Sequence, residues 1–283
     1  MNDLKLFAKG WNDYELIDAG GNKKLERWGK IVTIRPERQA YFQSGLSFKE
    51  WNEIAHWEFV DKNNTSGTWK ALKPNSPDAW NITFQGCVFE LRLTKFKHIG
   101  VFPEQNINWK KISSFLYEEA KMLNLFAYTG GASLIGKKKG ADVYHIDAVK
   151  QLIRWAKTNQ ELSELDNIRW VLEDALKFSQ REVKRGNQYD LIIMDPPAWG
   201  IGAKNEKWKI ENKLDELIGN ASTLLRSNGQ LILNTYSPKV EVLDLLQFAK
   251  KHFIESNFSV HELWMTSSTQ KELYFGNILY AKK

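Results

Sequence analysis

The sequence predicts an α/β protein: a doubly wound, mostly parallel seven-stranded sheet, preceded by a small antiparallel β domain. Two observations predict this fold. From residue 101 onward, short apolar runs alternate with segments of helical periodicity, which is typical of a parallel sheet covered by helices. Before residue 101, apolar and polar residues alternate with a period of two, which indicates strands with one buried face. We therefore expect a β-rich domain over residues 1–100 and an α/β domain over residues 101–283.

The N-terminal domain begins with a predicted hairpin, in which residues 14–18 and 24–29 flank the turn Gly20-Gly21-Asn22. Five more strands are expected, over residues 31–36, 57–60, 68–72, 80–84 and 87–94. Only residues 48–54 have a helical period. We interpret this module as a sandwich or an open barrel. Its tryptophans could stack on nucleic-acid bases, but large aromatic residues also supply core area in a small module, and we favour the core.

The α/β domain is predicted to begin with a helix over residues 108–121, with Trp109 and Ile112 on its apolar face. Five parallel strands and two closing strands are then expected at 122–126, 141–147, 168–172, 189–194, 229–235, 258–265 and 274–281. The intervening helices are expected near 133–140, 148–162, 176–185, 214–225 and 240–253. In such sheets ligands bind at the carboxyl ends of the strands, so the residues there are the candidate site residues.

The first strand of the α/β domain runs into a turn with two adjacent glycines, Gly130 and Gly131. Glycine permits positive φ and the close approach of a ligand, because it has no Cβ. Thr129 or Ser133 could cap the helix that follows. The turn is not the G-x-G-x-x-G motif that holds a pyrophosphate, which disfavours a dinucleotide and favours a ligand without phosphates.

Carboxylates end the second and third strands. Asp147 is placed to accept hydrogen bonds from both hydroxyls of a ribose, which predicts an adenosyl ligand. Asp174 could hold an adenine amino group while the backbone N–H of Ala175 binds a ring nitrogen. An acid at the start of a helix also serves as an ordinary cap, and both interpretations of Asp174 stay open.

The fourth strand is followed by Asp195-Pro196-Pro197-Ala198-Trp199. Two prolines fix a rigid turn, and we expect their carbonyl groups to have no competing donors nearby. A carboxylate and an aromatic ring beside them could accept hydrogen bonds from an amino or imino edge while stacking a planar ring, as a flipped base requires. The structural alternative is a loop with a capping acid. The position at the end of a strand favours a functional site.

Charge and cysteine content limit the function classes. The net charge is +6, which is compatible with a polyanionic partner, but the excess is spread along the chain. The one tight basic cluster, Lys137-Lys138-Lys139, suits a solvated helix end as well as it suits RNA. A single cysteine, Cys87, excludes an internal disulfide and a multi-cysteine metal site, and no metal site is predicted.

The expected compartment follows from the absence of targeting signals. Residues 1–5 lack the apolar core of a signal peptide, and no window approaches the length of a membrane span. We therefore expect a cytoplasmic protein without a membrane partner. The sequence leaves the oligomeric state open.

Residues 121–237 resemble a class I S-adenosylmethionine-dependent methyltransferase with a Rossmann-like sheet. The segments N-L-F-A-Y-T-G-G at 124–131 and D-P-P-A-W at 195–199 resemble the large-subunit ribosomal RNA methyltransferases that modify cytosine C5 or guanine N7. L-E-R-W-G at 25–29 and F-P-E-Q at 102–105 resemble a less characterised bacterial branch of that family. The resemblance implies S-adenosyl-L-methionine as the cofactor and RNA, specifically ribosomal RNA, as the partner.

The resemblance also implies two sets of site residues. The cofactor methionine is expected near residues 128–131, its ribose at Asp147 and its adenine near Asp174. The implied cofactor-binding residues are Phe126, Tyr128, Thr129, Gly130, Gly131, Asp147, Ala148, Asp174, Ala175 and Asp195. The implied catalytic residues, which would hold the target ring, are Asp195, Pro196, Pro197 and Trp199.

One departure from the family bears on the reaction. Methylation at cytosine C5 needs a cysteine thiolate, which relatives with that chemistry carry just after the fifth strand. This chain has Asn234-Thr235-Tyr236-Ser237-Pro238 there, which argues against C5 and leaves a ring or exocyclic nitrogen. Asn234 and Tyr236 are second-rank pocket candidates. The open alternatives are a methyltransferase acting on a protein or small molecule, and a non-catalytic RNA-binding protein with a vestigial cofactor pocket.

Overall fold

The computed structural model describes residues 4–62, 66–202, 206–254 and 257–283. Residues 1–3, the first residues of the predicted N-terminal domain, lie outside the described residues. The chain forms two compact units. The α/β unit comprises the N-terminal tail up to Leu6 together with Ile107–Leu263 and Gly276–Lys283, and the β unit comprises Phe7–Asn106 and Trp264–Phe275. The β unit thus takes a second segment from far along the chain, which the local sequence pattern does not indicate.

The α/β unit contains an eight-stranded sheet. In spatial order its strands are β1 (Lys5–Phe7), β16 (Phe258–Thr266), β17 (Glu272–Lys282), β15 (Leu225–Thr235), β12 (Tyr189–Met194), β9 (Lys121–Leu125), β10 (Asp142–Asp147) and β11 (Arg169–Leu172). Strands β11, β10, β9, β12 and β15 are parallel, and β17 is antiparallel to β15. All seven predicted strands are present. β1 adds an eighth, which at three residues is too short to show a periodic pattern.

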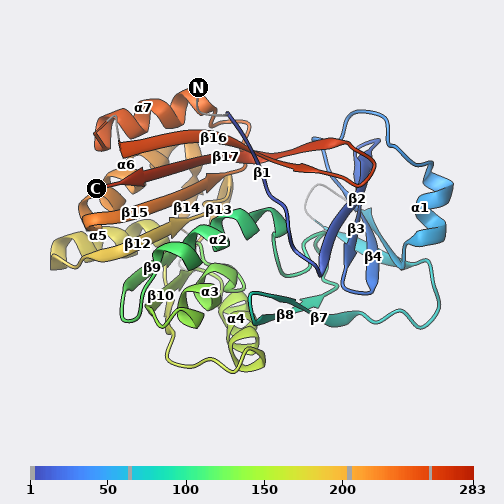
Figure 1. Ribbon diagram of the computed structural model, residues 1–283, viewed down its shortest axis with the longest axis horizontal. Helices are drawn as coiled ribbons and strands as arrows, with labels where there is room; N and C mark the ends of the chain where they lie inside the picture. The colour runs from blue at the N-terminus through green and yellow to red at the C-terminus, as the bar shows by residue number, and fades with distance from the viewer. Residues whose placement is uncertain (1–3, 63–65, 203–205, 255–256) are drawn as a thin grey trace. The chain divides into compact units, whose positions relative to one another are not determined.

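Helices cover both faces of this sheet (Figure 1). One face carries α2 (Asn106–Phe115), α3 (Gly131–Lys138) and α4 (Lys150–Leu162), and the other carries α5 (Ala175–Arg185), α6 (Ile210–Leu224) and α7 (Val242–His252). Every residue of β12 is buried, as expected for a central strand between two helix layers. The doubly wound α/β prediction is therefore confirmed. No helix in the described part of the chain is long and apolar enough to cross a membrane.

Two helix boundaries differ from the prediction. The helix expected over residues 108–121 ends at Phe115, because the carboxylate of Asp190 binds the Tyr117 hydroxyl at 3.1 Å and the Lys121 N–H at 2.7 Å. Those contacts hold the chain in a turn that leads into β9. At the other end of the unit, α6 begins at Ile210 rather than at residue 214.

The β unit contains a five-stranded sheet in the order β2 (Tyr14–Gly20), β3 (Lys23–Trp28), β4 (Ile31–Pro36), β5 (Trp57–Asp61) and β6 (Gly67–Ala71). A separate hairpin pairs β7 (Ala79–Phe84) with β8 (Cys87–Arg92). The predicted helix α1 (Phe48–Ile54) is present, with a capping box formed by Ser47 and Glu50. Because α1 lies between β4 and β5, those two strands pair in parallel, whereas the other pairs are antiparallel. The sheet is open rather than a closed barrel.

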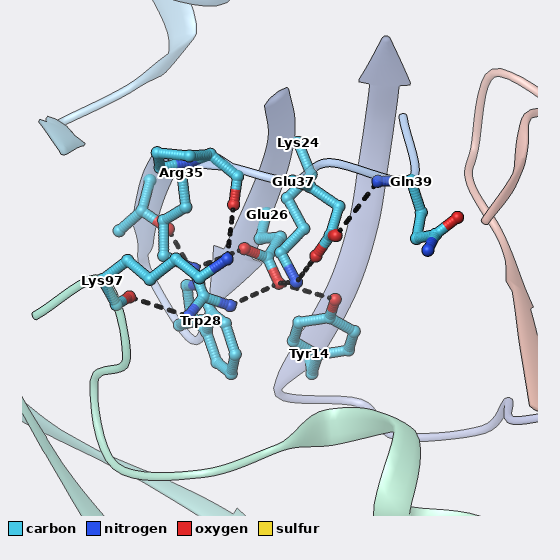
Figure 2. A network of polar contacts seen from close by, with 10 residues as sticks. Tyr14, Lys24, Glu26, Trp28, Arg35, Glu37, Gln39 and Lys97 are labelled. Carbon is cyan, nitrogen blue, oxygen red and sulfur yellow. Dashed lines mark hydrogen bonds and ion pairs between the residues drawn. The ribbon is translucent and has the colours of Figure 1, made fainter. Parts of the chain in front are cut away.

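Buried charges hold the β unit together (Figure 2). Two guanidinium nitrogens of Arg35 donate to the two carboxylate oxygens of Glu26, both at 2.7 Å, and the Tyr14 hydroxyl donates to Glu26 at 3.0 Å. Burial acts to raise the pKa of Glu26, but Arg35 and Lys24 outweigh it and hold the pKa below its ordinary value. Arg35 also lies 5.0 Å from the ring of the fully buried Trp28. Trp28 therefore belongs to the core, which agrees with the interpretation of the tryptophans as core residues rather than base-stacking residues.

Candidate cofactor and substrate site

The register of the sheet brings the candidate residues to one edge. Leu125 pairs with Ile146 and with Met194, so β9, β10 and β12 end level with one another. Two further pairs, Asp147 with Leu172 and Met194 with Leu233, extend this row to β11 and β15. The chain proceeds outward from β9 to β10 and β11 and then returns to β12 on the other side, so the strand order reverses between β9 and β12. A reversal of this kind is where open α/β sheets bind ligands.

The loop after β9 has an unusual backbone. Phe126, Tyr128 and Gly130 all have left-handed dihedrals, with φ of 57°, 53° and 90°. Such a conformation costs a non-glycine residue on the order of 1–3 kcal/mol and persists where surrounding contacts enforce it, often at functional sites. Here the N–H of Ala127 donates to the carbonyl of Ile146 at 3.0 Å, which ties the loop to β10. The predicted cofactor loop is therefore a tightly held structure.

Asp147 fixes the same loop from the end of β10. Its two carboxylate oxygens accept hydrogen bonds from the N–H groups of Tyr128 at 2.9 Å and Val149 at 2.8 Å. Burial raises the pKa of Asp147 to about 6, although these backbone hydrogen bonds act to lower it. Each oxygen keeps a second lone pair, so the carboxylate can still accept from a ribose hydroxyl. Ala148 follows directly and is partly exposed.

The proposed capping roles of Thr129 and Ser133 are wrong. Gly130 precedes α3, and no side chain caps this helix. The Ser133 hydroxyl instead contacts Asn124 at 2.9 Å and His145 at 3.0 Å in the interior, because its position in the first turn faces the sheet. Burial lowers the pKa of His145 to about 3, so the imidazole is neutral. Without a side-chain cap, the first turn of α3 can offer N–H groups to the carboxylate of a cofactor methionine.

Gly130 and Gly131 are each required for a different structural reason. Gly130 has a left-handed φ, as predicted for the pair. Gly131 does not, but a Cβ there would lie 2.4 Å from the ring of Trp109 on α2. Close packing of α2 therefore accounts for Gly131, and no local sequence pattern indicates this contact. Close approach of a ligand to Gly131 stays a prediction.

Asp174 and Ala175 are buried at the junction of β11 and α5. Asp174 caps the helix, because one of its oxygens accepts from the Lys177 N–H at 3.0 Å. The preceding residue, Glu173, donates its N–H to the carbonyl of Asp147 at 3.1 Å, which joins the ends of β10 and β11. The interpretation of Asp174 as an ordinary helix cap is thus confirmed. Its role toward adenine stays a prediction, for which the second oxygen is available.

Asp195 directly follows β12, and its carboxylate lies beside Asn234 near the end of β15. The Asn234 amide donates to the Asp195 carboxylate at 3.3 Å. Burial raises the pKa of Asp195 to about 6, although this hydrogen bond acts to lower it. The amide oxygen of Asn234 and the hydroxyl of Thr235 are buried without a hydrogen-bond partner among the described residues. Unused acceptors beside a carboxylate fit a ligand that brings N–H donors, such as a cofactor ammonium group or a base.

One expectation about the Pro-Pro turn is wrong. The carbonyl of Pro197 does have a competing donor, because the indole N–H of Trp208 binds it at 2.6 Å. Trp208 comes from β14 (Lys207–Lys209), which pairs with β13 (Trp199–Ile201) in a hairpin that the sequence analysis missed. Of the two prolines, Pro196 is the one whose carbonyl stays a candidate base acceptor.

Trp199 lies in β13, four residues after Asp195. Its side chain is 58% exposed, so a ring face is open to a planar ligand. Phe126, from the cofactor loop, packs against Trp208 with 4.8 Å between ring centroids. Trp208, which belongs to neither predicted set, thus links Phe126 of the cofactor-binding set to the backbone of Pro197 in the catalytic set.

The sheet order, the row of loops at its reversal and the acid at the end of β10 define an α/β enzyme that binds a nucleoside-containing cofactor. The model of the S-adenosylmethionine-dependent methyltransferase family matches residues 56–240, and the chain belongs to this family. It is therefore an S-adenosylmethionine-dependent methyltransferase. The uncapped start of α3, Asp147 and the unused acceptor of Asn234 fit the charged and hydroxyl groups of that cofactor.

Two curated relatives match about two thirds of the chain. Ribosomal RNA large subunit methyltransferase K/L of Shewanella frigidimarina is 27% identical over 205 residues, covering 66% of this chain and 28% of the relative. Ribosomal RNA large subunit methyltransferase K of Neisseria meningitidis serogroup B is 29% identical over 200 residues, covering 66% of this chain and 56% of the relative. The matches span only part of these relatives.

A solved structure matches the whole chain. The S-adenosylmethionine-dependent methyltransferase from Agrobacterium tumefaciens superposes with a TM-score of 0.93 and 32% sequence identity. The match covers 100% of this chain and 94% of that protein. The α/β sheet and the preceding β domain are thus found together in a second methyltransferase, which confirms the predicted fold class and the predicted enzyme class.

Proposed function

We propose that this chain transfers a methyl group from S-adenosylmethionine to a nitrogen of a nucleobase in RNA, with ribosomal RNA as the substrate. The observation that carries the proposal is the partly buried hydrogen bond between Asn234 and Asp195, which lies in the same row of strand ends as Asp147. The names of the two curated relatives, both ribosomal RNA methyltransferases, support RNA as the acceptor. A cytoplasmic location is part of the same proposal.

The loops after β9, β10 and β11 hold the cofactor in this proposal. The N–H groups at the start of α3 bind its carboxylate, and Asp147 accepts from its ribose. Asp174 and the backbone N–H of Ala175 contact the adenine. Phe126, Tyr128, Thr129, Gly130, Gly131 and Ala148 complete the cofactor pocket. When bound, the cofactor supplies an electrophilic methyl group on a sulfonium.

The target base is held at the end of β12. Asp195 and the carbonyl of Pro196 accept hydrogen bonds from its amino or imino edge, and the exposed ring of Trp199 stacks on its face. Since Trp208 already binds the carbonyl of Pro197, we assign Pro197 to the shape of the turn rather than to the base. Asn234 holds Asp195 in place, and Tyr236 is a further candidate for the pocket wall.

A nitrogen target follows from the groups that are present. Methylation at cytosine C5 needs a thiolate that adds to the ring, and Cys87, the one cysteine, is fully buried in β8 of the β unit. A nitrogen such as guanine N7 already presents a lone pair, so no covalent nucleophile is needed. The protein then has to hold the base in line with the methyl group. Alignment of two reactants can supply roughly 7–11 kcal/mol of the barrier.

The two units have different roles in methyl transfer. Ile107–Leu263 and Gly276–Lys283 carry the transfer, and Phe7–Asn106 with Trp264–Phe275 form an accessory unit. The buried network around Glu26 suits such a unit, because paired internal charges help to specify one arrangement of strands.

Transfer of labelled methyl groups tests the proposal. Purified protein and labelled S-adenosylmethionine are added to separated RNA, DNA, protein and small-molecule fractions from cells that lack this protein. We expect label in RNA that digests to one modified nucleoside carrying the methyl group on nitrogen. Asp195→Ala should abolish transfer while the cofactor still binds. Label in protein or in small molecules alone would overturn the RNA assignment, and a C5-methylated pyrimidine would overturn the nitrogen assignment.

A further inference from the structure

The hairpin after the Pro-Pro turn has two different faces. In its antiparallel register, Trp199 lies opposite Lys209 and Ile201 lies opposite Lys207, while Gly200 lies opposite Trp208. Successive side chains of a strand point to opposite faces. One face, which we call the outer face, therefore carries Trp199, Ile201, Lys207 and Lys209. The inner face carries Gly200 and Trp208.

The inner face fixes the hairpin to the α/β unit. Trp208 is only 2% exposed, packs on Phe126 and donates its indole N–H to the carbonyl of Pro197 at 2.6 Å. The hairpin is thus anchored to the cofactor loop and to the turn that follows Asp195. An anchored inner face gives the outer face a defined direction, because the side chains of a strand cannot change face without a shift of register.

The outer face is open and cationic. Trp199 and Ile201 are 58% and 52% exposed, and Lys207 and Lys209 are exposed as well. Neither of these lysines has an ion-pair partner among the described residues. The acid next to them, Glu206, is bound instead by Lys177 at 2.7 Å. The outer face therefore offers an aromatic ring and two uncompensated positive charges at neighbouring positions.

The packing of the hairpin does not account for this combination. An exposed tryptophan leaves a large apolar ring in water, and the two lysines, both in β14, lie opposite Trp199 and Ile201 rather than opposite a carboxylate. Single-stranded nucleic acid uses both features, because its bases stack on aromatic rings and its phosphates bind cations. A double helix would use only the cations, since its bases are already stacked on one another and cannot reach a side-chain ring.

We propose that the outer face of the β13–β14 hairpin binds an unpaired RNA strand that carries the target base. Trp199 stacks on a base, Ile201 contacts the sugar next to it, and Lys207 and Lys209 bind phosphates. Trp199 is four positions after Asp195, so their Cα atoms lie at most about 14 Å apart and the strand is held close to the transfer site. The inference rests on the proposed function, and it adds the form of the substrate and three binding residues.

Binding of labelled single-stranded RNA by the full chain tests this proposal. The double variant Lys207→Gln/Lys209→Gln, which we call the hairpin pair, is compared with the matched control Lys138→Gln/Lys139→Gln, which changes two exposed lysines at the C-terminal end of α3. Affinity is measured over a range of salt concentrations. Each lost contact to a single strand lowers the slope of log affinity against log salt by about 0.7, so the hairpin pair should lower it by about 1.4. The control should leave the slope unchanged.

Two further measurements make the test decisive. Trp199→Ala should weaken single-strand binding roughly tenfold at every salt concentration, since it removes stacking without removing charge. The same RNA as a duplex should bind the wild-type chain and Trp199→Ala equally, because a duplex does not stack its bases on a side-chain ring. An unchanged salt slope in the hairpin pair would overturn the proposal, as would equal losses of duplex and single-strand affinity in Trp199→Ala.

The fractionated transfer assay separates this inference from the proposed function. Methyl transfer to RNA by the wild-type chain, together with an unchanged salt slope in the hairpin pair, would keep the function and discard the hairpin site. Transfer to protein alone would discard the function and, with it, the hairpin site as a substrate site. Binding of cofactor by the hairpin pair at wild-type affinity shows in either case that the variant is folded.

Discussion

The carboxylate of Asp147 accepts a hydrogen bond from the backbone N–H of Tyr128 at 2.9 Å, although 19 residues separate them in the chain. The contact joins the end of β10 to the loop after β9, whose backbone is held in left-handed conformations at Phe126 and Tyr128. One side chain thus both shapes the cofactor loop and stays available to a ribose. This double role makes Asp147 the most informative position for a test of cofactor binding.

Asp147→Ala should weaken binding of S-adenosylhomocysteine by roughly 10- to 150-fold. This range corresponds to about 1.5–3 kcal/mol for hydrogen bonds to a charged group. Isothermal titration calorimetry measures the affinity. The matched control is Asp142→Ala at the opposite end of the same strand, where the carboxylate binds Arg169 on the surface. Equal affinity of Asp147→Ala and the wild-type chain would remove Asp147 from the cofactor site.

Methyl transfer should depend on the ionisation of Asp195. Burial raises its pKa to about 6, and only the ionised carboxylate is a full acceptor for an N–H donor. We expect kcat/KM to rise as pH increases through about 6 and to level off above 7. Because the pKa of Asp147 is also about 6, the profile is measured with S-adenosylmethionine already bound. Asp195→Asn should lower kcat/KM at pH 8 at least tenfold and remove this rise. A rise that persists in Asp195→Asn would assign the titration to another group.

The same carboxylate should cost stability at neutral pH. Its pKa in the folded chain, about 6, lies above the value of about 3.9 for an unfolded aspartate, so the folded state binds the proton more tightly. This contribution to stability is complete below pH 4 and is lost as pH rises through 6. We therefore expect Asp195→Asn to melt at a higher temperature than the wild-type chain at pH 8, with a smaller difference at pH 5. Calorimetry at both pH values measures this, and a lower melting temperature at pH 8 would contradict it.

The buried pair of Arg35 and Glu26 should be far more sensitive to the loss of one partner than to the loss of both. Arg35→Met leaves a buried carboxylate without its cation and should destabilise the β unit by about 3–5 kcal/mol. The double variant with Glu26→Leu removes both charges and should recover most of that loss. Urea unfolding followed by tryptophan fluorescence compares the variants. Additive losses would show that the two side chains do not act as a pair.

The sequence could predict most of the helices and strands because their signals are local. The apolar run L-I-I-M in β12 and the alternation in β7 depend on neighbouring residues alone. It also predicted Asp147, Asp174 and Asp195 as candidates, because the end of a strand can be located from the strand itself. The hairpin of β13 and β14 was missed, since three-residue strands are too short for periodicity to identify.

The sequence by itself determined the fold class, the strand ends and the residue types at the candidate site. Only the tertiary structure decided which of those residues have other partners. Pro197 is bound by Trp208, Gly131 is required by Trp109, and Ser133 faces Asn124 rather than its own helix end. Each of these contacts joins residues from different elements. Periodicity and motifs describe one element at a time, whereas a hydrogen-bond partner or a packing neighbour depends on how the elements come together in space.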